Sequence, residues 1–133
     1  MRILIVEDDW LLADDLRSLL EQDGCEVVGL AADCETALRL ADCQKPDVAF
    51  VDMRLQDGCT GPGIGLALAN RGICVIFATG EPHLAPRNHP RILGTFAKPV
   101  LDSEYLVALT TCRRQVKVND RTDVTTSDRK VDE

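Results

Sequence analysis

Residues 2–9 of the chain read Arg-Ile-Leu-Ile-Val-Glu-Asp-Asp, a short apolar run that ends in three carboxylates. Two later runs have the same form, because residues 48–51 precede Asp52 and residues 93–97 precede Lys98. Short apolar runs bounded in this way are typical of buried strands in a parallel sheet, whose carboxyl ends reach the same edge. The pattern therefore predicts that carboxylates and an ammonium meet where open α/β sheets carry their sites.

Segments with helical periodicity separate these runs. Leucines recur at helical spacing over residues 12–20, after Asp8 or Asp9 as an N-cap. Further helices are expected after Asp33, from near Pro62 to Asn70, and from Asp102 or Ser103 onward. The strands between them are expected over residues 3–6, 25–31, 47–52, 73–78 and 93–97. This alternation predicts an α/β fold with a doubly wound five-stranded parallel sheet, for which we expect the strand order 2-1-3-4-5.

The region of the fourth helix is rich in proline. Pro82, Pro86 and Pro90 recur through residues 81–91. A proline inside a helix costs about 3 kcal/mol. The fourth helix is therefore expected to be short or irregular.

Composition limits the class of protein. The chain has 133 residues with 22 acidic and 15 basic side chains, a formal net charge of −7. One domain is expected over residues 1–114, and the polar residues 115–133 lack periodicity and are expected to form a flexible tail. The sequence has no cluster of Lys and Arg, so nucleic-acid binding is not expected. The apolar run near the start is too short for a signal sequence or a membrane span, so a cytoplasmic location is expected.

The strand ends bring complementary chemical groups together. In the order 2-1-3-4-5, strands one and three are neighbours, so Asp8 and Asp52 converge, and Thr79 and Lys98 reach the same edge. Two carboxylates about 4 Å apart repel by about 4 kcal/mol at an effective dielectric constant of about 20. Lys98 and a divalent ion that prefers oxygen ligands, such as Mg²⁺, would offset this repulsion. The set supports attack by Asp52 on a phosphoryl group.

At these positions the chain resembles the receiver domain of two-component response regulators, which has a flavodoxin/CheY-like fold. The resemblance covers about residues 2–114 and rests on four motifs, which are residues 3–9, Val51-Asp52-Met53, Ala78-Thr79-Gly80 and Lys98-Pro99. The sequence Phe77-Ala78-Thr79-Gly80 is also similar to a subclass of single-domain receivers that carries Phe-Ala-Thr-Gly at the end of strand four.

The resemblance implies a role for each residue of the site. Asp52 is implied as the phosphoacceptor, Thr79 and Lys98 as the groups that bind the phosphoryl oxygens, and the Lys98–Pro99 bond as cis. The implied Mg²⁺ ligands are Asp52, Asp8, Glu7 through water, and the backbone carbonyl of Arg54.

The chain departs from the family pattern near the site. Thr95 stands where receivers often carry an aromatic residue, three positions before the lysine. Arg54 and Glu81 lie two residues beyond Asp52 and Thr79, at positions that influence access of water to the phosphoryl group in the family. We expect Arg54 and Glu81 to pair across the site and to gate hydrolysis.

The implied function is that of a single-domain response regulator. A sensor histidine kinase or a histidine phosphotransfer protein would donate the phosphoryl group to Asp52. Because no output domain follows Arg114, the signal is expected to pass to an unknown downstream protein, unless the domain drains phosphate from the kinase as a sink. No enzymatic activity is expected beyond phosphorylation and dephosphorylation of its own aspartate.

Other interpretations stay open. A binding module that keeps the fold without phosphorylation is one alternative. A phosphatase with an aspartate nucleophile is a second, although such enzymes carry an acid where this chain has Arg54. The glycine-rich residues 61–65 match neither dinucleotide nor P-loop motifs and are interpreted as a flexible loop.

Overall fold

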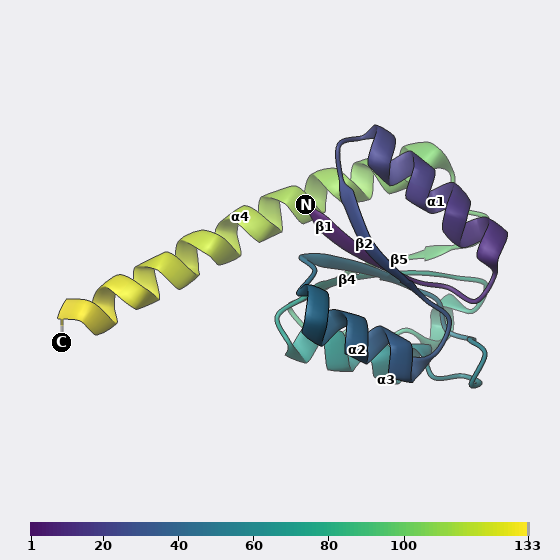
Figure 1. Cartoon of the computed structure of the whole chain (residues 1–133), viewed down its shortest axis with the longest axis horizontal. Helices are drawn as coiled ribbons and strands as arrows, with labels where there is room; N and C mark the ends of the chain where they lie inside the picture. The colour runs from purple at the N-terminus through teal and green to yellow at the C-terminus, as the bar shows by residue number, and fades with distance from the viewer. Residues whose placement is uncertain (133) are drawn as a thin grey trace.

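The computed structural model describes the backbone of residues 1–132 and the side chains of residues 1–118. Five parallel strands form one sheet in the order β2-β1-β3-β4-β5 (Figure 1). The strands are β1 (Arg2–Val6), β2 (Glu26–Ala31), β3 (Val48–Val51), β4 (Cys74–Thr79) and β5 (Ile92–Ala97). The helices are α1 (Trp10–Gln22), α2 (Cys34–Gln44), α3 (Gly61–Asn70) and α4 (Asp102–Asp132). The predicted fold class and strand order are confirmed.

Alternation along the central strands builds two apolar cores. Ile3 and Ile5 of β1 pack with residues of α1 and α4, whereas Leu4 and Val6 pack with residues of α2 and α3. Figure 1 shows α2 and α3 together on one side of the sheet and α1 on the other. Because helices cover both faces, residues 3–6 of β1, all of β3 and residues 74–78 of β4 are apolar and buried. Polar side chains follow directly after these apolar stretches, at the carboxyl ends of the strands.

Aspartate caps fix the starts of the first two helices. Asp9 Oδ1 accepts hydrogen bonds from the amides of Leu11 and Leu12 at 3.1 and 3.3 Å. Asp33 Oδ1 accepts one from Thr36 at 2.8 Å. Of the two candidate caps for α1, Asp9 is therefore the one used. Asp8 makes no hydrogen bond within the part of the chain whose side chains are described, and its carboxylate is exposed.

The glycine-rich residues 61–65 form the first turns of α3, so the interpretation as a flexible loop is wrong. The helix predicted from near Pro62 to Asn70 is confirmed, with the proline in its first turn. Close packing explains two of the glycines. A Cβ atom on Gly61 would lie 2.0 Å from the carbonyl oxygen of Asp52, and one on Gly65 would lie 2.2 Å from the Phe77 ring.

The segment between β4 and β5 has no α-helix, as predicted. It contains only η1, a single turn of 3-10 helix (Pro82–Leu84). The rest is held to the end of α3 by side chains: His89 Nε2 lies 2.9 Å from Asn70 Oδ1, and Arg91 donates to the carbonyl of Gly72 at 2.7 Å. Ala85 of this segment is part of the apolar core, and Leu84 packs against it.

The last helix is longer than the sequence indicates. The pattern predicted a helix as far as Cys112 and a solvated tail after residue 114, but the backbone of α4 is helical to Asp132 (Figure 1). Val116 still packs against the core, whereas no apolar stripe continues beyond it. The domain boundary at residue 114 and the flexibility of the tail stay predictions. Within the described residues, no helix is both long and apolar enough to cross a membrane.

Candidate functional site

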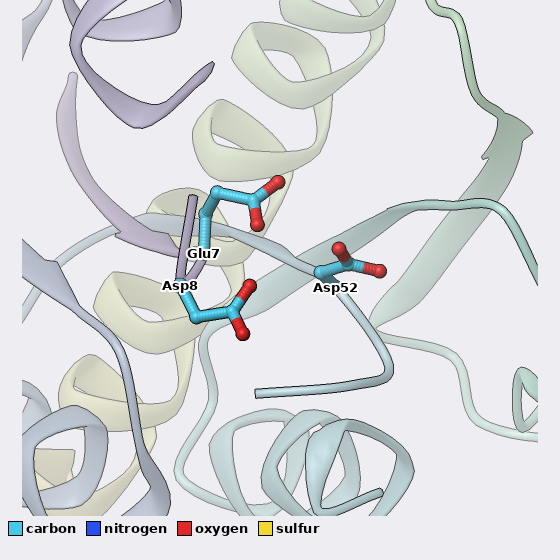
Figure 2. Close-up of side chains that lie close together, drawn as sticks. All are labelled: Glu7, Asp8 and Asp52. Atoms are coloured by element: carbon cyan, nitrogen blue, oxygen red, sulfur yellow. The ribbon is translucent and has the colours of Figure 1, made fainter. Parts of the chain in front are cut away.

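The ends of β1 and β3 place three carboxylates around one space. Val6 pairs in register with Val51, and the amide of Asp52 donates to the Val6 carbonyl at 3.0 Å. Glu7, Asp8 and Asp52 therefore follow neighbouring strands at the same level, and each offers a carboxylate oxygen within 4.8 Å of the others. Figure 2 shows these three side chains grouped at the sheet edge. The predicted convergence of Asp8 and Asp52 is present.

Lys98 reaches this cluster from β5. Its backbone amide donates to the Thr79 carbonyl at 2.9 Å, which ties the end of β5 to the end of β4. Its Nζ donates to Asp52 Oδ2 at 2.8 Å and also contacts Glu7 Oε1. The Lys98–Pro99 peptide bond is cis, the isomer that the resemblance implies. One ammonium therefore sits between two carboxylates.

Burial and charge act in opposite directions on these groups. Burial raises the pKa of Glu7, and the nearby Asp52 carboxylate adds to this effect, so that both outweigh the lowering by Lys98. Burial alone would lower the pKa of Lys98, but hydrogen bonds to Asp52 and Glu7 outweigh it, and the pKa is raised. Lys98 thus remains a cation, and it does not fully compensate the acidic cluster.

Backbone donors orient both acids. The amide of Met53 donates to Asp52 Oδ1 at 2.7 Å, so each oxygen of the Asp52 carboxylate has one hydrogen-bond donor. The amide of Asp9 donates to Glu7 Oε2 at 3.1 Å. The Met53 amide is a functional group that side-chain patterns do not reveal, since any residue type supplies it.

Arg54 and Glu81 form a two-point ion pair beside the site. Arg54 Nε lies 2.7 Å from Glu81 Oε2, and a second guanidinium nitrogen lies 3.0 Å from Oε1. This hydrogen bonding raises the pKa of Arg54 and lowers that of Glu81. The amide of Glu81 donates at 3.0 Å to Oγ1 of Thr79, which is 1% exposed. The pair exists as expected, and it is joined through the Glu81 amide to the Thr79 hydroxyl.

The loop after Asp52 is closed by contacts that the sequence analysis missed. Leu55 and Gly58 exchange two backbone hydrogen bonds of 2.9 and 3.1 Å. Asp57 accepts from the Thr60 hydroxyl at 2.7 Å and from the Cys34 amide at the start of α2 at 2.9 Å, and the Thr60 bond contributes most to its lowered pKa. Asp57 lies shortly before α3, and an acid in such a position is a recognisable sequence signal. The sequence does not show, however, that it accepts from the Cys34 amide, 23 residues away.

The donor set fits a hard divalent cation. Three carboxylates meet one ammonium, which leaves excess negative charge, and Asp8 has no hydrogen bond or ion pair among the described side chains. Mg²⁺ prefers such oxygen ligands and retains several waters. The backbone carbonyl of Arg54 stays a predicted ligand.

Comparisons with known proteins agree with this architecture. A stretch of 54 residues is 41% identical to the transcriptional regulatory protein PdtaR of Mycobacterium tuberculosis and covers 41% of this chain and 26% of that protein. A stretch of 82 residues is 35% identical to the phyllosphere-induced regulator PhyR of Methylorubrum extorquens and covers 60% of this chain and 31% of that protein. The matches thus span about a quarter to a third of these relatives.

A solved structure and a family profile extend the likeness over most of the chain. The response regulator REC domain of PhyR from Erythrobacter litoralis superposes with a TM-score of 0.75 at 26% identity, over 84% of this chain and 88% of that one. The profile of the response regulator receiver domain matches residues 3–108. The chain therefore belongs to the response regulator receiver domain family.

Proposed function

We propose that Asp52 accepts a phosphoryl group from a phosphohistidine donor in a Mg²⁺-dependent reaction. The observation that carries this proposal is the state of the Asp52 carboxylate. Its two oxygens are held by the Met53 amide and by Lys98, and it faces the carboxylates of Glu7 and Asp8. A nucleophile that is fixed in position and paired with a cation suits phosphoryl transfer, in which positioning and charge stabilisation supply most of the catalysis.

The chain's own residues have separate tasks in this reaction. A carboxylate oxygen of Asp52 forms the new bond to phosphorus while the phosphorus–nitrogen bond of the donor breaks and its imidazole leaves. Lys98 offsets charge on the phosphoryl oxygens, and the Thr79 hydroxyl donates to one of them after leaving its bond with Glu81. When bound, Mg²⁺ would neutralise negative charge as a Lewis acid. The ion would be held by Asp52, by Asp8, by Glu7 through water, and by the Arg54 carbonyl.

Intact-mass measurement tests the proposal. The protein is incubated with a small phosphodonor, with and without Mg²⁺, and one added phosphoryl group is expected only when Mg²⁺ is present. Asp52→Asn should give no adduct. Asp42→Asn, which removes an exposed carboxylate of α2 whose one ion-pair partner among the described side chains is Arg71, should behave as wild type. If the wild type gains no phosphoryl group under any of these conditions, the domain is a binding module without phosphorylation.

The Arg54–Glu81 pair is proposed to slow hydrolysis of the phosphorylated form by limiting access of water. Glu81→Ala should shorten the lifetime of the adduct by about twofold to fivefold, since an exposed ion pair contributes roughly 0.2–1 kcal/mol. Decay of the adduct mass with time measures this lifetime. Arg54→Ala should have a similar effect, and the double variant should show no further shortening. An unchanged lifetime in Glu81→Ala would remove the pair from the mechanism.

The output is proposed to pass through protein contacts, with a role as a phosphate sink as the alternative. Large apolar side chains are exposed near the acidic site, at the start of α1 and around the start of α4: Trp10, Leu11, Leu101 and Val107. Such residues are typical of contact surfaces, and a sensor kinase or histidine phosphotransfer protein must approach Asp52 from this edge. The proposal places the reaction in the cytoplasm, in line with the short apolar run near the start of the sequence.

A further inference from the structure

A cavity of about 470 Å³ lies between α1 and the start of α4. Its floor is the sheet, including Ile5 and Phe50, and Leu12 and Leu16 of α1 form one wall. Val100 and Tyr105 form the opposite wall, and the Tyr105 ring stands edge-on to Phe50 at a centroid distance of 5.5 Å. Small-molecule sites have volumes of about 300–1,000 Å³ and mostly apolar linings. The cavity has this size and character.

The charged groups around the cavity are mainly acidic. Four carboxylates line it, from Glu7, Asp15, Asp52 and Asp102, and Lys98 is the single cation among the lining residues. Lys98 is already bound to Glu7 and Asp52 at the inner end. Asp15 and Asp102 are exposed, and neither forms an ion pair or side-chain hydrogen bond among the residues whose side chains are described. An apolar interior is therefore combined with a rim of unpaired negative charge.

We propose that this cavity binds a small protonated amine with an apolar body. The apolar part would displace water from the surfaces of Leu16, Phe50 and Val100, and the ammonium would lie between the carboxylates of Asp15 and Asp102. A neutral molecule would gain only the first of these interactions, and an anion would be repelled at the rim. The inference does not depend on phosphorylation of Asp52, because the rim carboxylates lie outside the candidate phosphoryl site.

Three probes with the same apolar body separate the two contributions: octylamine, octanol and octyl sulfate. Each is titrated into the full chain at saturating Mg²⁺, and affinity and location are followed from the backbone amide NMR shifts of Leu16, Val100 and Tyr105. Octylamine should bind about twofold to fivefold more tightly than octanol, as expected for ammonium pairing with exposed carboxylates. Octyl sulfate should bind most weakly.

Variants locate the binding and provide the control. Asp15→Asn combined with Asp102→Asn should reduce the affinity for octylamine to that for octanol and leave octanol unchanged. Glu35→Gln removes an exposed carboxylate at the start of α2, on the other side of the sheet, and should have no effect. Leu12→Trp should block all three probes, because Leu12 lies 45% exposed at the mouth and a larger side chain there fills the opening.

Two results would overturn the proposal. Equal affinities of the three probes would show that the rim carboxylates select nothing. Shift changes spread over other surfaces, or an equal loss of octylamine affinity in Glu35→Gln, would show attraction to the net negative charge of the whole chain. Both results are independent of the intact-mass experiment, so failure here leaves the proposed phosphorylation of Asp52 unaffected.

Discussion

Gly61→Ala is expected to lower the free energy of unfolding by about 2 kcal/mol, within the range of roughly 1–3 kcal/mol for overpacked sites. The added Cβ would lie 2.0 Å from the carbonyl oxygen of Asp52 and 2.5 Å from Cα of Met53. Both neighbours are backbone atoms that follow β3, so relief requires a shift of α3 or of Asp52 itself. Phosphorylation of Asp52 should therefore also slow. Urea denaturation and the intact-mass assay measure the two effects.

Gly63→Ala is the matched control. Gly63 lies in the same turn of α3, and a Cβ there meets no atom within 4 Å. The change should raise stability by about 0.5 kcal/mol through the lower conformational entropy of the unfolded chain, with unchanged phosphorylation. If both variants were stabilised, the close approach of α3 to Asp52 would be contradicted. If both variants were destabilised equally, the loss of stability would come from replacing any glycine at the start of α3 and not from the contact with Asp52.

The strands were predictable because their sequence signal and their burial have the same cause. A strand covered on both faces must be apolar at every position, and the first polar residue then marks its end. Val51 before Asp52 and Val6 before Glu7 are such boundaries, and the observed strands end there. The position of the candidate site followed from the same boundaries, because parallel strands share one carboxyl edge.

Side-chain partners at the site were less predictable. The role of Glu7 as a metal ligand through water stays a prediction, but its contact with Lys98, 91 residues away, and its hydrogen bond from the Asp9 amide were not foreseen. Asp57 similarly fixes the loop through the amide of Cys34. A single sequence does not identify such long-range pairs. Each carboxylate could contact any of several cations and backbone amides in the same fold.

The sequence pattern predicted neither the length of α4 nor the cavity between α1 and α4, for different reasons. After Arg114 the chain has no apolar periodicity, so nothing in the pattern distinguishes a helix that extends from the domain from a loop. The cavity between α1 and α4 depends on how Leu16, Phe50 and Tyr105 fill the space between elements. Residue types predict that these side chains face the core, but not how completely they fill it.

Lys98→Ala is expected to slow phosphorylation of Asp52 by about a hundredfold or more, the usual effect of removing one group that stabilises transition-state charge. Its ammonium is the one cation that binds the Asp52 carboxylate among the described residues, at 2.8 Å. The fold should lose about 1–2 kcal/mol, less than the roughly 3–5 kcal/mol for breaking a fully buried pair, because the Lys98 side chain is 24% exposed. Phosphorylation rates at saturating Mg²⁺ and urea denaturation measure these effects.

Two further substitutions separate charge from general damage. Lys117→Ala removes an exposed lysine of α4 and should leave both rate and stability unchanged. Lys98→Arg keeps the positive charge but replaces a compact ammonium with a planar fork, so it should recover part of the rate. Full activity of Lys98→Ala would show that the Asp52–Lys98 pair holds only the resting state. A loss that Lys98→Arg does not relieve at all would instead assign the effect to the shape of the lysine.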